Sequence, residues 1–263
     1  MLIEQHFHGA FGINFSNCSV DDVIKLAKKM KQVGIDAIYP TLVTDTIENI
    51  KKQIEIIKKA SKNEGSDIAK ILGIHLEAIF LNPAKKGIHN SDLFLEPNIE
   101  NYKLIEDDFI KIVTLAPELD NGLIDYLKAK GVKVQAGHCL GGDLTKCDGV
   151  THLFNAMSGI NHRAESTALS ALLDDNIYVE VIADGIHLSD DILKLIYKTK
   201  PKDKIVLISD CLPCAGLKEP CTFEFAGETI YYDGKKAVSK DGTLAGSAML
   251  LTEIIQRVKN LNL

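Results

Sequence analysis

Short apolar runs alternate with amphipathic stretches along almost the whole chain, and this alternation is the strongest constraint on the fold. Eight runs have the length and the apolar character of buried strands. They cover residues 2–8, 36–43, 69–77, 110–115, 132–136, 149–154, 178–182 and 204–209. The stretches between them place apolar residues at helical spacing, as in residues 19–33 and 46–61. We also expect helices at 118–130 and 247–258 and a short helical stretch near Asp143. The pattern therefore predicts an α/β fold.

Eight strands with intervening helices in 263 residues are typical of a TIM (β/α)8 barrel. We expect one domain over residues 1–263, with a hairpin insertion at about 222–238 that turns at Ala226-Gly227 or Asp233-Gly234. The alternative is an open doubly wound sheet. It is disfavoured because polar residues follow nearly every strand, and a barrel brings those strand ends together.

Composition excludes several classes of function. The net charge of −6 gives no support to a nucleic-acid partner, and no apolar run is long enough to span a membrane. The N-terminal residues lack the pattern of a signal peptide, so we expect a cytoplasmic protein with six reduced cysteines. Cys211 and Cys214 form a single CxxC, for which a soft-metal or redox role is the minority interpretation.

Histidines and carboxylates gather at the ends of the predicted strands. A lone histidine is more often structural than functional, but here the same placement recurs along the chain. Imidazole and carboxylate ligands together suit Zn²⁺ or Fe²⁺, and a catalytic ion of this kind activates water. Glu77, at the end of a buried strand, is the expected centre of the site, because an unpaired buried carboxylate is costly. The candidates are His6, His8, Glu77, His138, His152, His187 and Asp210.

Seven short motifs, in chain order, resemble the N-acetylglucosamine-6-phosphate deacetylase family of the amidohydrolase superfamily. THLFNAM and GTLAGS are specific to that family, whereas HxH alone marks only the superfamily. The motifs are HxH at 6–8, GIHLE to KKGIH at 73–89, AGH at 136–138, THLFNAM at 151–157, DGIH at 184–187, SD at 209–210 and GTLAGS at 242–247. The resemblance implies metal-dependent hydrolysis of the acetamide of N-acetylglucosamine 6-phosphate, in amino-sugar catabolism.

The resemblance also implies a role for each candidate residue. Glu77, His138 and His152 hold the main metal, while His6 and His8 supply a second site that Glu77 can bridge. The chain thus takes one or two ions of Zn or Fe. Asp210 is the general base and acid, and His89 polarises the acetamide carbonyl.

Substrate-binding roles follow from the same resemblance. Asn155, Ala156 and Arg163 match phosphate-binding positions, and His187 matches a contact to a sugar hydroxyl. Leu244 and Ala245 line the acetyl pocket. Arg163 also stands out chemically, because the chain has only two arginines and a guanidinium suits a phosphate well.

The chain departs from the family pattern in three ways. Ala78-Ile79 replaces the usual Gly-Pro after Glu77, and Cys211 replaces the usual Ala after Asp210. The family's small β-sandwich domain has no counterpart in this sequence, which we therefore expect to be a bare barrel, able to form a homodimer. Two alternatives stay open: a metallohydrolase of another N-acetyl amino-sugar phosphate or a cyclic amide, and a non-catalytic metal- or sugar-phosphate-binding barrel.

Overall fold

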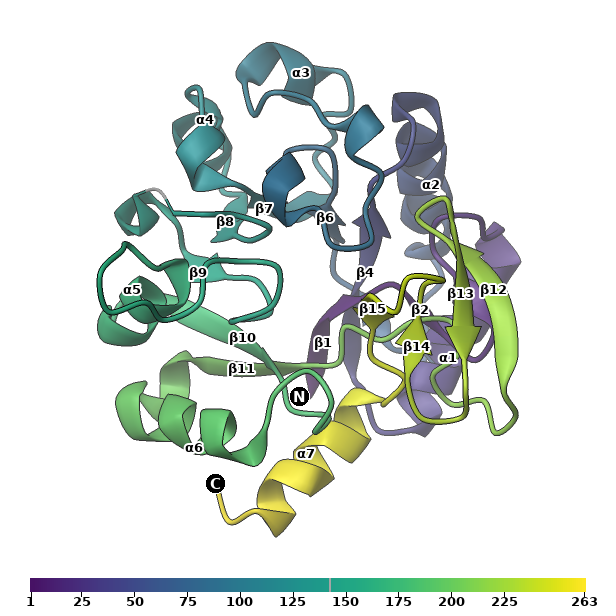
Figure 1. Cartoon of the computed structure of the whole chain (residues 1–263). Helices are drawn as coiled ribbons and strands as arrows, with labels where there is room; N and C mark the ends of the chain where they lie inside the picture. Colours follow the sequence, from purple (N-terminus) through teal and green to yellow (C-terminus); the bar gives the residue numbers. More distant parts are fainter. Residues whose placement is uncertain (142) are drawn as a thin grey trace.

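The computed structural model describes residues 1–141 and 143–263, and its centre is a parallel sheet. Figure 1 shows the strands around a common axis with the helices outside them. The strands follow one another in chain order: β1 (Ile3–Phe7), β4 (Ala37–Val43), β6 (Ile74–Glu77), β7 (Ile110–Leu115), β8 (Lys133–Ala136), β9 (Gly149–Val150), β10 (Tyr178–Ile182) and β11 (Ile205–Ile208). The short β5 (Lys70–Ile71) also pairs with β4.

The two edges of this sheet meet just beyond the end of β11. The amide of Asp210 donates to the His6 carbonyl at 2.9 Å, and the amide of His8 donates to the Cys211 carbonyl at 2.8 Å. These hydrogen bonds join the first strand to the segment after the last one. The sheet is thus a nearly closed TIM barrel, as the alternation of apolar runs predicts, and an open doubly wound sheet is excluded.

The helices lie outside the barrel and begin at residues that can cap them. Ser19 starts the first helix with a capping box, since its hydroxyl accepts from the Asp22 amide while the Asp22 carboxylate accepts from the Ser19 amide. Thr46, Ser166 and Ser189 cap later helices with the hydroxyl alone, which accepts from the backbone amide three residues further on. The helices are α1 (Val20–Gln32), α2 (Ile47–Ala60), α3 (Ile99–Lys103), α4 (Leu123–Ala129), α5 (Thr167–Leu173), α6 (Asp190–Thr199) and α7 (Leu251–Asn260).

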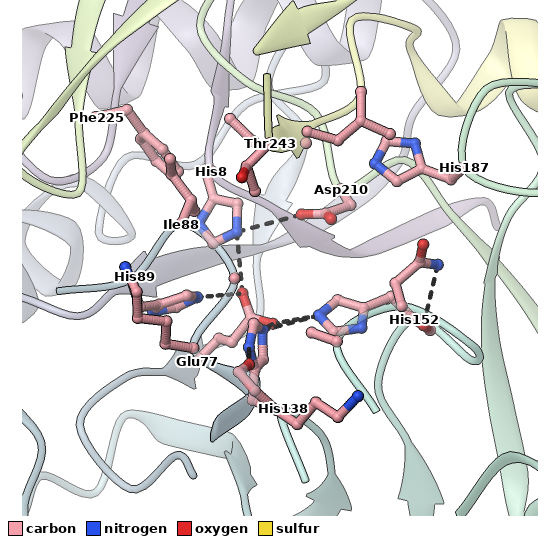
Figure 2. A pocket seen from close by; sticks show the side chains of 18 of the residues that line it. His8, Glu77, Ile88, His89, His138, His152, His187, Asp210, Phe225 and Thr243 are labelled. Carbon is pink, nitrogen blue, oxygen red and sulfur yellow. Dashed lines mark hydrogen bonds and ion pairs between the residues drawn. The ribbon is translucent and has the colours of Figure 1, made fainter. Parts of the chain in front are cut away.

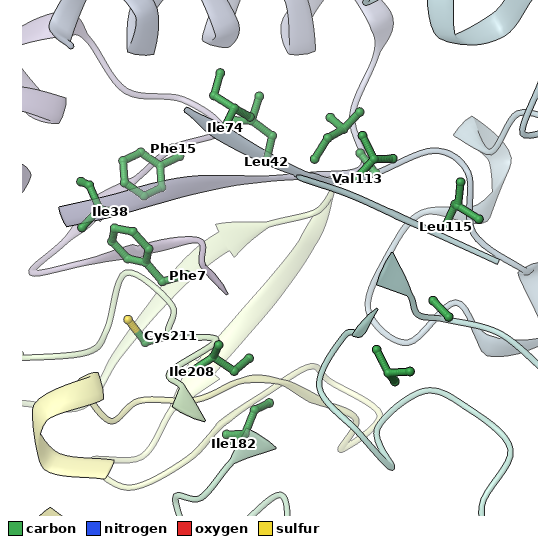
Figure 3. Packing of buried hydrophobic residues seen from close by; sticks show 14 of the residues in the cluster. Phe7, Phe15, Ile38, Leu42, Ile74, Val113, Leu115, Ile182, Ile208 and Cys211 are labelled. Atoms are coloured by element: carbon green, nitrogen blue, oxygen red, sulfur yellow. The ribbon is translucent and has the colours of Figure 1, made fainter. Parts of the chain in front are cut away.

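The main apolar core fills the space between the strands and the helices (Figure 3). Helix α1 buries Val23, Leu26, Ala27 and Met30, four members of the apolar stripe that the sequence predicts. On the strand side, the rings of Phe7 and Phe15 pack edge to face with centroids 4.9 Å apart. Burial of this kind holds the barrel wall rigid, so the strand ends are fixed in position.

Two predicted strands are shorter than expected. The run 69–77 is broken at Gly73, whose φ of 154° interrupts the strand between β5 and β6. The run 149–154 is a strand only over β9, because the chain turns immediately afterwards. His152 has a φ of 31° and Phe154 a φ of 75°, and a strand does not accommodate these values. The turn carries His152 away from the line of the strand.

Two predicted helices begin later than expected. The stretch 118–130 opens with the 3-10 helix Pro117–Leu119, and α4 starts only at Leu123. The last helix starts at Leu251 rather than at Ser247, which pairs with Cys211 across an isolated bridge.

The structure adds short elements that the sequence did not predict: α3, the hairpin β2 (Gly9–Ala10) and β3 (Ile13–Asn14), and 3-10 helices at Pro83–Lys85, Ser91–Leu93 and Lys202–Lys204. The helical turn expected near Asp143 is the 3-10 helix Leu144–Lys146.

The insertion after β11 is larger than the predicted hairpin. It is a four-stranded antiparallel sheet of β12 (Cys221–Phe225), β13 (Glu228–Tyr232), β14 (Ala237–Val238) and β15 (Leu244–Gly246). The chain uses both predicted turns, at Ala226-Gly227 and at Asp233-Gly234. Phe225 and Ile230 pack with Leu212 in a second apolar cluster. This sheet therefore forms one wall at the carboxyl end of the barrel.

None of the helices in residues 1–141 and 143–263 combines the length and the apolar character that a membrane crossing requires.

A buried lysine ties the ends of two helices together and gives a prediction about stability. The Lys200 ammonium donates to the carbonyls of Ala171, Asp174 and Ile177, at and beyond the C-terminus of α5. Lys200→Met keeps the aliphatic volume but leaves those carbonyls without their charged donor, so we expect it to lower the free energy of unfolding by about 2–3 kcal/mol. Lys204→Met is the matched control, since the Lys204 hydrogen bond to Asn176 is exposed to solvent. Urea denaturation gives the free energy of unfolding of both variants. An equal loss in the two would contradict the stabilising role of the buried Lys200 ammonium.

Candidate metal centre and active site

The predicted site residues meet at the carboxyl end of the barrel. His6 lies in β1 and Glu77 ends β6, and four more residues follow within two positions of a strand end: His8, His138, His152 and Asp210. Parallel strands place their carboxyl ends at one face of a barrel, so residues far apart in the chain converge there. Figure 2 shows Glu77 at the centre of the resulting group, with His8 and Asp210 on one side and His138 and His152 on the other.

The two oxygens of Glu77 face different sets of histidines. Oε1 lies 2.8 Å from His152 Nε2 and 3.3 Å from His138 Nε2. Oε2 lies 3.2 Å from His6 Nε2 and 3.1 Å from His8 Nε2. One carboxylate is therefore shared between two clusters of donor atoms: Glu77, His138 and His152, and Glu77, His6, His8 and Asp210.

The cluster is buried, and each charged group shifts the pKa values of its neighbours. Burial alone would raise the pKa of Glu77, but His6 and the other imidazoles hold it well below the usual range. Burial likewise would lower the pKa of His6, yet the attraction of Glu77 and Asp210 raises it well above the usual value. Such a group of carboxylates is stable only beside positive charge, carried either by imidazolium or by a cation.

The donor set fits a divalent metal ion. A tetrahedral Zn²⁺ with ligands at about 2.0–2.1 Å has ligand atoms about 3.3 Å apart. His138 Nε2 and His152 Nε2 are 3.2 Å apart, close to that value. Two ring nitrogens facing each other can share at most one hydrogen, so a common cation is their natural partner. Nitrogen and carboxylate ligands with an open pocket beside them match a catalytic rather than a structural site.

Outer contacts orient two of these rings. His6 Nδ1 lies 2.9 Å from the Glu180 carboxylate, and His138 Nδ1 lies 2.8 Å from the Lys85 carbonyl. Both partners can only accept, so a hydrogen sits on Nδ1, and when the ring is neutral its lone pair lies on Nε2, the atom that faces Glu77. Sequence reasoning missed Glu180. Its one signal is a carboxylate inside the apolar run of β10, which a buried strand does not tolerate without a partner.

Asp210 lies on the opposite side of the cluster from His138 and His152. Its Oδ1 is 3.2 Å from His8 Nε2 and 3.3 Å from His6 Nε2. Burial raises the pKa of Asp210, but His6 and His8 outweigh this effect and hold the pKa below its ordinary value. The carboxylate is thus ionised and able to accept a proton.

His89 comes from the loop after β6 rather than from a strand end. Its Nε2 lies 3.9 Å from Glu77 Oε2, and its Nδ1 lies 2.8 Å from the Thr44 hydroxyl. Burial, together with the nearby His138, lowers the pKa of His89 well below the usual range. The ring is therefore neutral. Sequence reasoning also missed Thr44, which sits one residue past β4 with no motif around it.

An open pocket of about 380 Å³ lies over the cluster and takes in most of the predicted residues. It is large enough for a small ligand. Both the barrel loops and the inserted sheet contribute to it, the latter through Phe225 and Thr243. The predicted residues that line it are His8, Glu77, His89, His138, His152, Asn155, Ala156, His187, Asp210, Leu244 and Ala245.

Two predicted residues are absent from the pocket lining. His6 is fully buried behind the cluster, where it contacts Glu77 without facing the pocket. Arg163 is exposed on the segment that leads to α5, and its amide donates to the Asn161 side chain. His187, by contrast, faces the pocket with a ring that Asp184 holds: Nδ1 lies 2.7 Å from Asp184 Oδ2.

The backbone is strained where the functional side chains leave the barrel. His138 and Asp210 both have a φ of 49°, and Ile79 has a φ of 48°. Non-glycine residues rarely adopt such values, and for a β-branched residue such as Ile79 they are costly. Strain of this kind gathers at sites where side-chain direction matters more than stability.

The two cysteines near Asp210, Cys211 and Cys214, are buried free thiols. Cys211 is buried and its thiol lies 3.1 Å from the Gly9 carbonyl, to which it donates. Burial raises the pKa of Cys214 to about 12, so this thiol is not a thiolate at neutral pH. None of the metal-ligand clusters in the described residues contains a cysteine. The soft-metal interpretation of the CxxC is therefore not supported.

Curated proteins similar to this chain include two sugar-phosphate deacetylases. The chain is 32% identical to an N-acetylglucosamine-6-phosphate deacetylase of Bacillus subtilis (strain 168), covering 96% of the chain and 67% of that protein. It is 29% identical to an N-acetylgalactosamine-6-phosphate deacetylase of Escherichia coli O157:H7, over 98% of the chain and 71% of the relative. No protein-family model matches the chain.

A solved structure of a deacetylase has the same fold as this chain. It is an aspartate-to-alanine mutant of N-acetyl-D-glucosamine-6-phosphate deacetylase from Mycobacterium smegmatis, in complex with N-acetyl-D-glucosamine-6-phosphate. It superposes with a TM-score of 0.88 at 25% identity, covering 100% of this chain and 71% of that one. The chain therefore belongs to the N-acetylglucosamine-6-phosphate deacetylase family.

Proposed function

We propose that the chain hydrolyses the acetamide of N-acetylglucosamine 6-phosphate to glucosamine 6-phosphate and acetate, in amino-sugar catabolism. One observation carries the proposal: Glu77 joins two histidine clusters at the floor of an open pocket, with Asp210 and His89 beside it. Amide hydrolysis needs an activated water, stabilisation of the carbonyl oxygen and an acid for the nitrogen, and this arrangement offers a group for each need.

Glu77, His138 and His152 would hold the main ion, and His6 and His8 would hold a second one beside it. Zn²⁺ and Fe²⁺ are the ions that such ligands favour. When bound, the ion supplies an activated water and polarises the acetamide carbonyl. Glu180 and the Lys85 carbonyl keep the rings of His6 and His138 in the tautomer that ligation requires.

Asp210 would move the proton in the reaction. Its ionised carboxylate takes a proton from the attacking water and then gives it to the amine nitrogen as the C–N bond breaks. His6 and His8 hold Oδ1 on one side, which fixes the direction of the carboxylate. His89 would donate a hydrogen bond to the carbonyl oxygen as negative charge develops on it.

The pocket walls would recognise the sugar and its phosphate. We propose that Asn155 and Ala156 bind the phosphate, that His187 contacts a sugar hydroxyl, and that Leu244 and Ala245 enclose the acetyl group. Lys85 and Lys86 also line the pocket and add positive charge for an anionic substrate. Arg163 lies outside the lining, so its contact with the phosphate remains a prediction.

We further propose that residues 1–263 act as one domain, as a homodimer in the cytoplasm. The six cysteines are free thiols, the state that a reducing compartment maintains. A homodimer would cover exposed apolar side chains such as Leu173, which is 71% exposed.

A substrate panel tests the proposed specificity. The second candidate substrate is N-acetylgalactosamine 6-phosphate, which one relative is named for. We expect kcat/KM to be highest for N-acetylglucosamine 6-phosphate and at least about 100-fold lower for N-acetylglucosamine, which leaves the phosphate subsite unpaired. Acetate release measures all three. Higher kcat/KM on the galacto substrate would favour the second candidate, and equal kcat/KM without the phosphate would contradict a sugar-phosphate enzyme.

A further inference from the structure

Two hydrogen bonds on one hydroxyl single out Thr44 at the edge of the site. Its Oγ1 accepts from the Ile79 amide at 3.1 Å and lies 2.8 Å from His89 Nδ1. Thr44 is buried, as are Ile79 and His89. It directly follows β4, so the barrel wall fixes its position. Thr44 thus links the rigid wall to the start and to the end of the loop that carries His89.

The direction of the second hydrogen bond follows from counting hydrogens. The Ile79 amide can only donate, so the Thr44 oxygen accepts there. The hydroxyl then has one hydrogen of its own to give. Among the described residues its other hydrogen-bond partner is His89 Nδ1, and a hydroxyl hydrogen left unpaired in a buried site is costly. Thr44 therefore donates to Nδ1, which then carries no hydrogen of its own, so the ring hydrogen of His89 lies on Nε2.

This arrangement is opposite to that of two neighbouring histidines. His6 Nδ1 faces the Glu180 carboxylate and His138 Nδ1 faces the Lys85 carbonyl, and neither partner can donate. When neutral, these rings present a lone pair at Nε2, as a metal ligand must. His89 presents an N–H at Nε2 instead, 3.9 Å from Glu77 Oε2 (Figure 2). The hydrogen-bond partner of Nδ1 thus decides the role of Nε2. In His89 it makes Nε2 a hydrogen-bond donor, and in His6 and His138 it leaves Nε2 free to bind a metal.

We propose that Thr44 is a positioning residue that holds His89 as the Nε2–H tautomer, ready to hydrogen-bond the acetamide oxygen of the substrate. This inference rests on the proposed deacetylase function. His89 transfers no proton in this role: its N–H stays intact while negative charge builds on the carbonyl oxygen. A ring with the hydrogen on Nδ1 would turn a lone pair toward that oxygen and would repel it.

The kinetic test compares Thr44→Val with Thr44→Ser. Valine keeps the shape of threonine but cannot donate to Nδ1, whereas serine keeps the hydroxyl. We expect Thr44→Val to lower kcat by about 10–100-fold with KM changed by less than about threefold, as is typical when an outer partner of an active-site histidine is lost. Thr44→Ser is expected to stay within about threefold of the original chain in both constants.

The spectroscopic test is independent of turnover. Nitrogen NMR of protein labelled with ¹⁵N-histidine distinguishes a protonated ring nitrogen from an unprotonated one, and His89→Gln identifies the His89 signals. We expect a protonated Nε2 and an unprotonated Nδ1 for His89 in the original chain and in Thr44→Ser, and a mixture or the reverse in Thr44→Val. Because the original chain is itself measured, the test does not depend on the folding of a variant.

Three outcomes would overturn the proposal. They are a protonated Nδ1 on neutral His89 in the original chain, unchanged kcat in Thr44→Val, and an equal loss of kcat in Thr44→Ser, which would indicate a packing role only. A chain that shows the expected tautomer but releases no acetate would contradict the proposed function and leave the assignment of Thr44 to His89 intact. The two failures are thus distinguishable.

Discussion

Asp210→Asn is expected to lower kcat for acetate release by about 10³-fold, with the affinity for N-acetylglucosamine 6-phosphate changed by less than about threefold. The amide retains the shape of the carboxylate and can still hydrogen-bond near His6 and His8. It cannot accept a proton from water or return one to the leaving nitrogen. Steady-state kinetics gives kcat, and calorimetric titration of the slow variant gives the affinity.

Asp203→Asn is the matched control for this substitution. Asp203 is exposed and precedes β11, whereas Asp210 follows the same strand at its other end. The control is expected to keep kcat within about twofold, as surface changes away from special contacts usually do. A value above one tenth of the original kcat in Asp210→Asn would mean that another group moves the proton.

Glu77→Gln is expected to disrupt the whole metal centre. One oxygen of Glu77 contacts His138 and His152, and the other contacts His6 and His8. Glutamine has a single amide oxygen, so it can act as a metal ligand on one side only. Loss of an outer partner of a ligand already weakens metal binding about 10–100-fold, so loss of a ligand is expected to exceed about 100-fold. Metal content after dialysis, together with kcat, measures the effect.

Glu118→Gln is the matched control for Glu77→Gln. It removes a carboxylate that is not a predicted metal ligand. Glu118 binds the Asn82 side chain and the Leu140 amide, and it belongs to none of the ligand clusters in the described residues. We expect its metal content and kcat to match those of the original chain. Full metal content in Glu77→Gln would contradict the central place of Glu77.

Much of the site could be predicted from the sequence because the barrel itself brings the residues together. Glu77, His138 and Asp210 sit at or just past the ends of apolar runs, and the carboxyl ends of parallel strands share one face. Local spacing was thus enough to place them on that face. His89 was found by resemblance only, since it belongs to a loop that no periodic pattern describes.

The partners of these residues could not be predicted in the same way. Thr44 and Glu180 act through atoms 45 and 174 positions away along the chain, and their roles depend on strand register. The early end of β9 also escaped prediction. Its run of residues is apolar enough for a strand, but the left-handed backbone at His152 ends it. That conformation depends on tertiary contacts rather than on local preference.

Release of acetate from N-acetylglucosamine 6-phosphate by the purified chain is the most direct test of the central claim. The chain is stripped of metal with a chelator, assayed, and assayed again after addition of Zn²⁺ or Fe²⁺. We predict that stripping abolishes acetate release, that one of these ions restores it, and that glucosamine 6-phosphate appears in equal amount. Absence of acetate release with every ion, from folded protein that binds the ion, would contradict the deacetylase function and favour a non-catalytic sugar-phosphate-binding barrel.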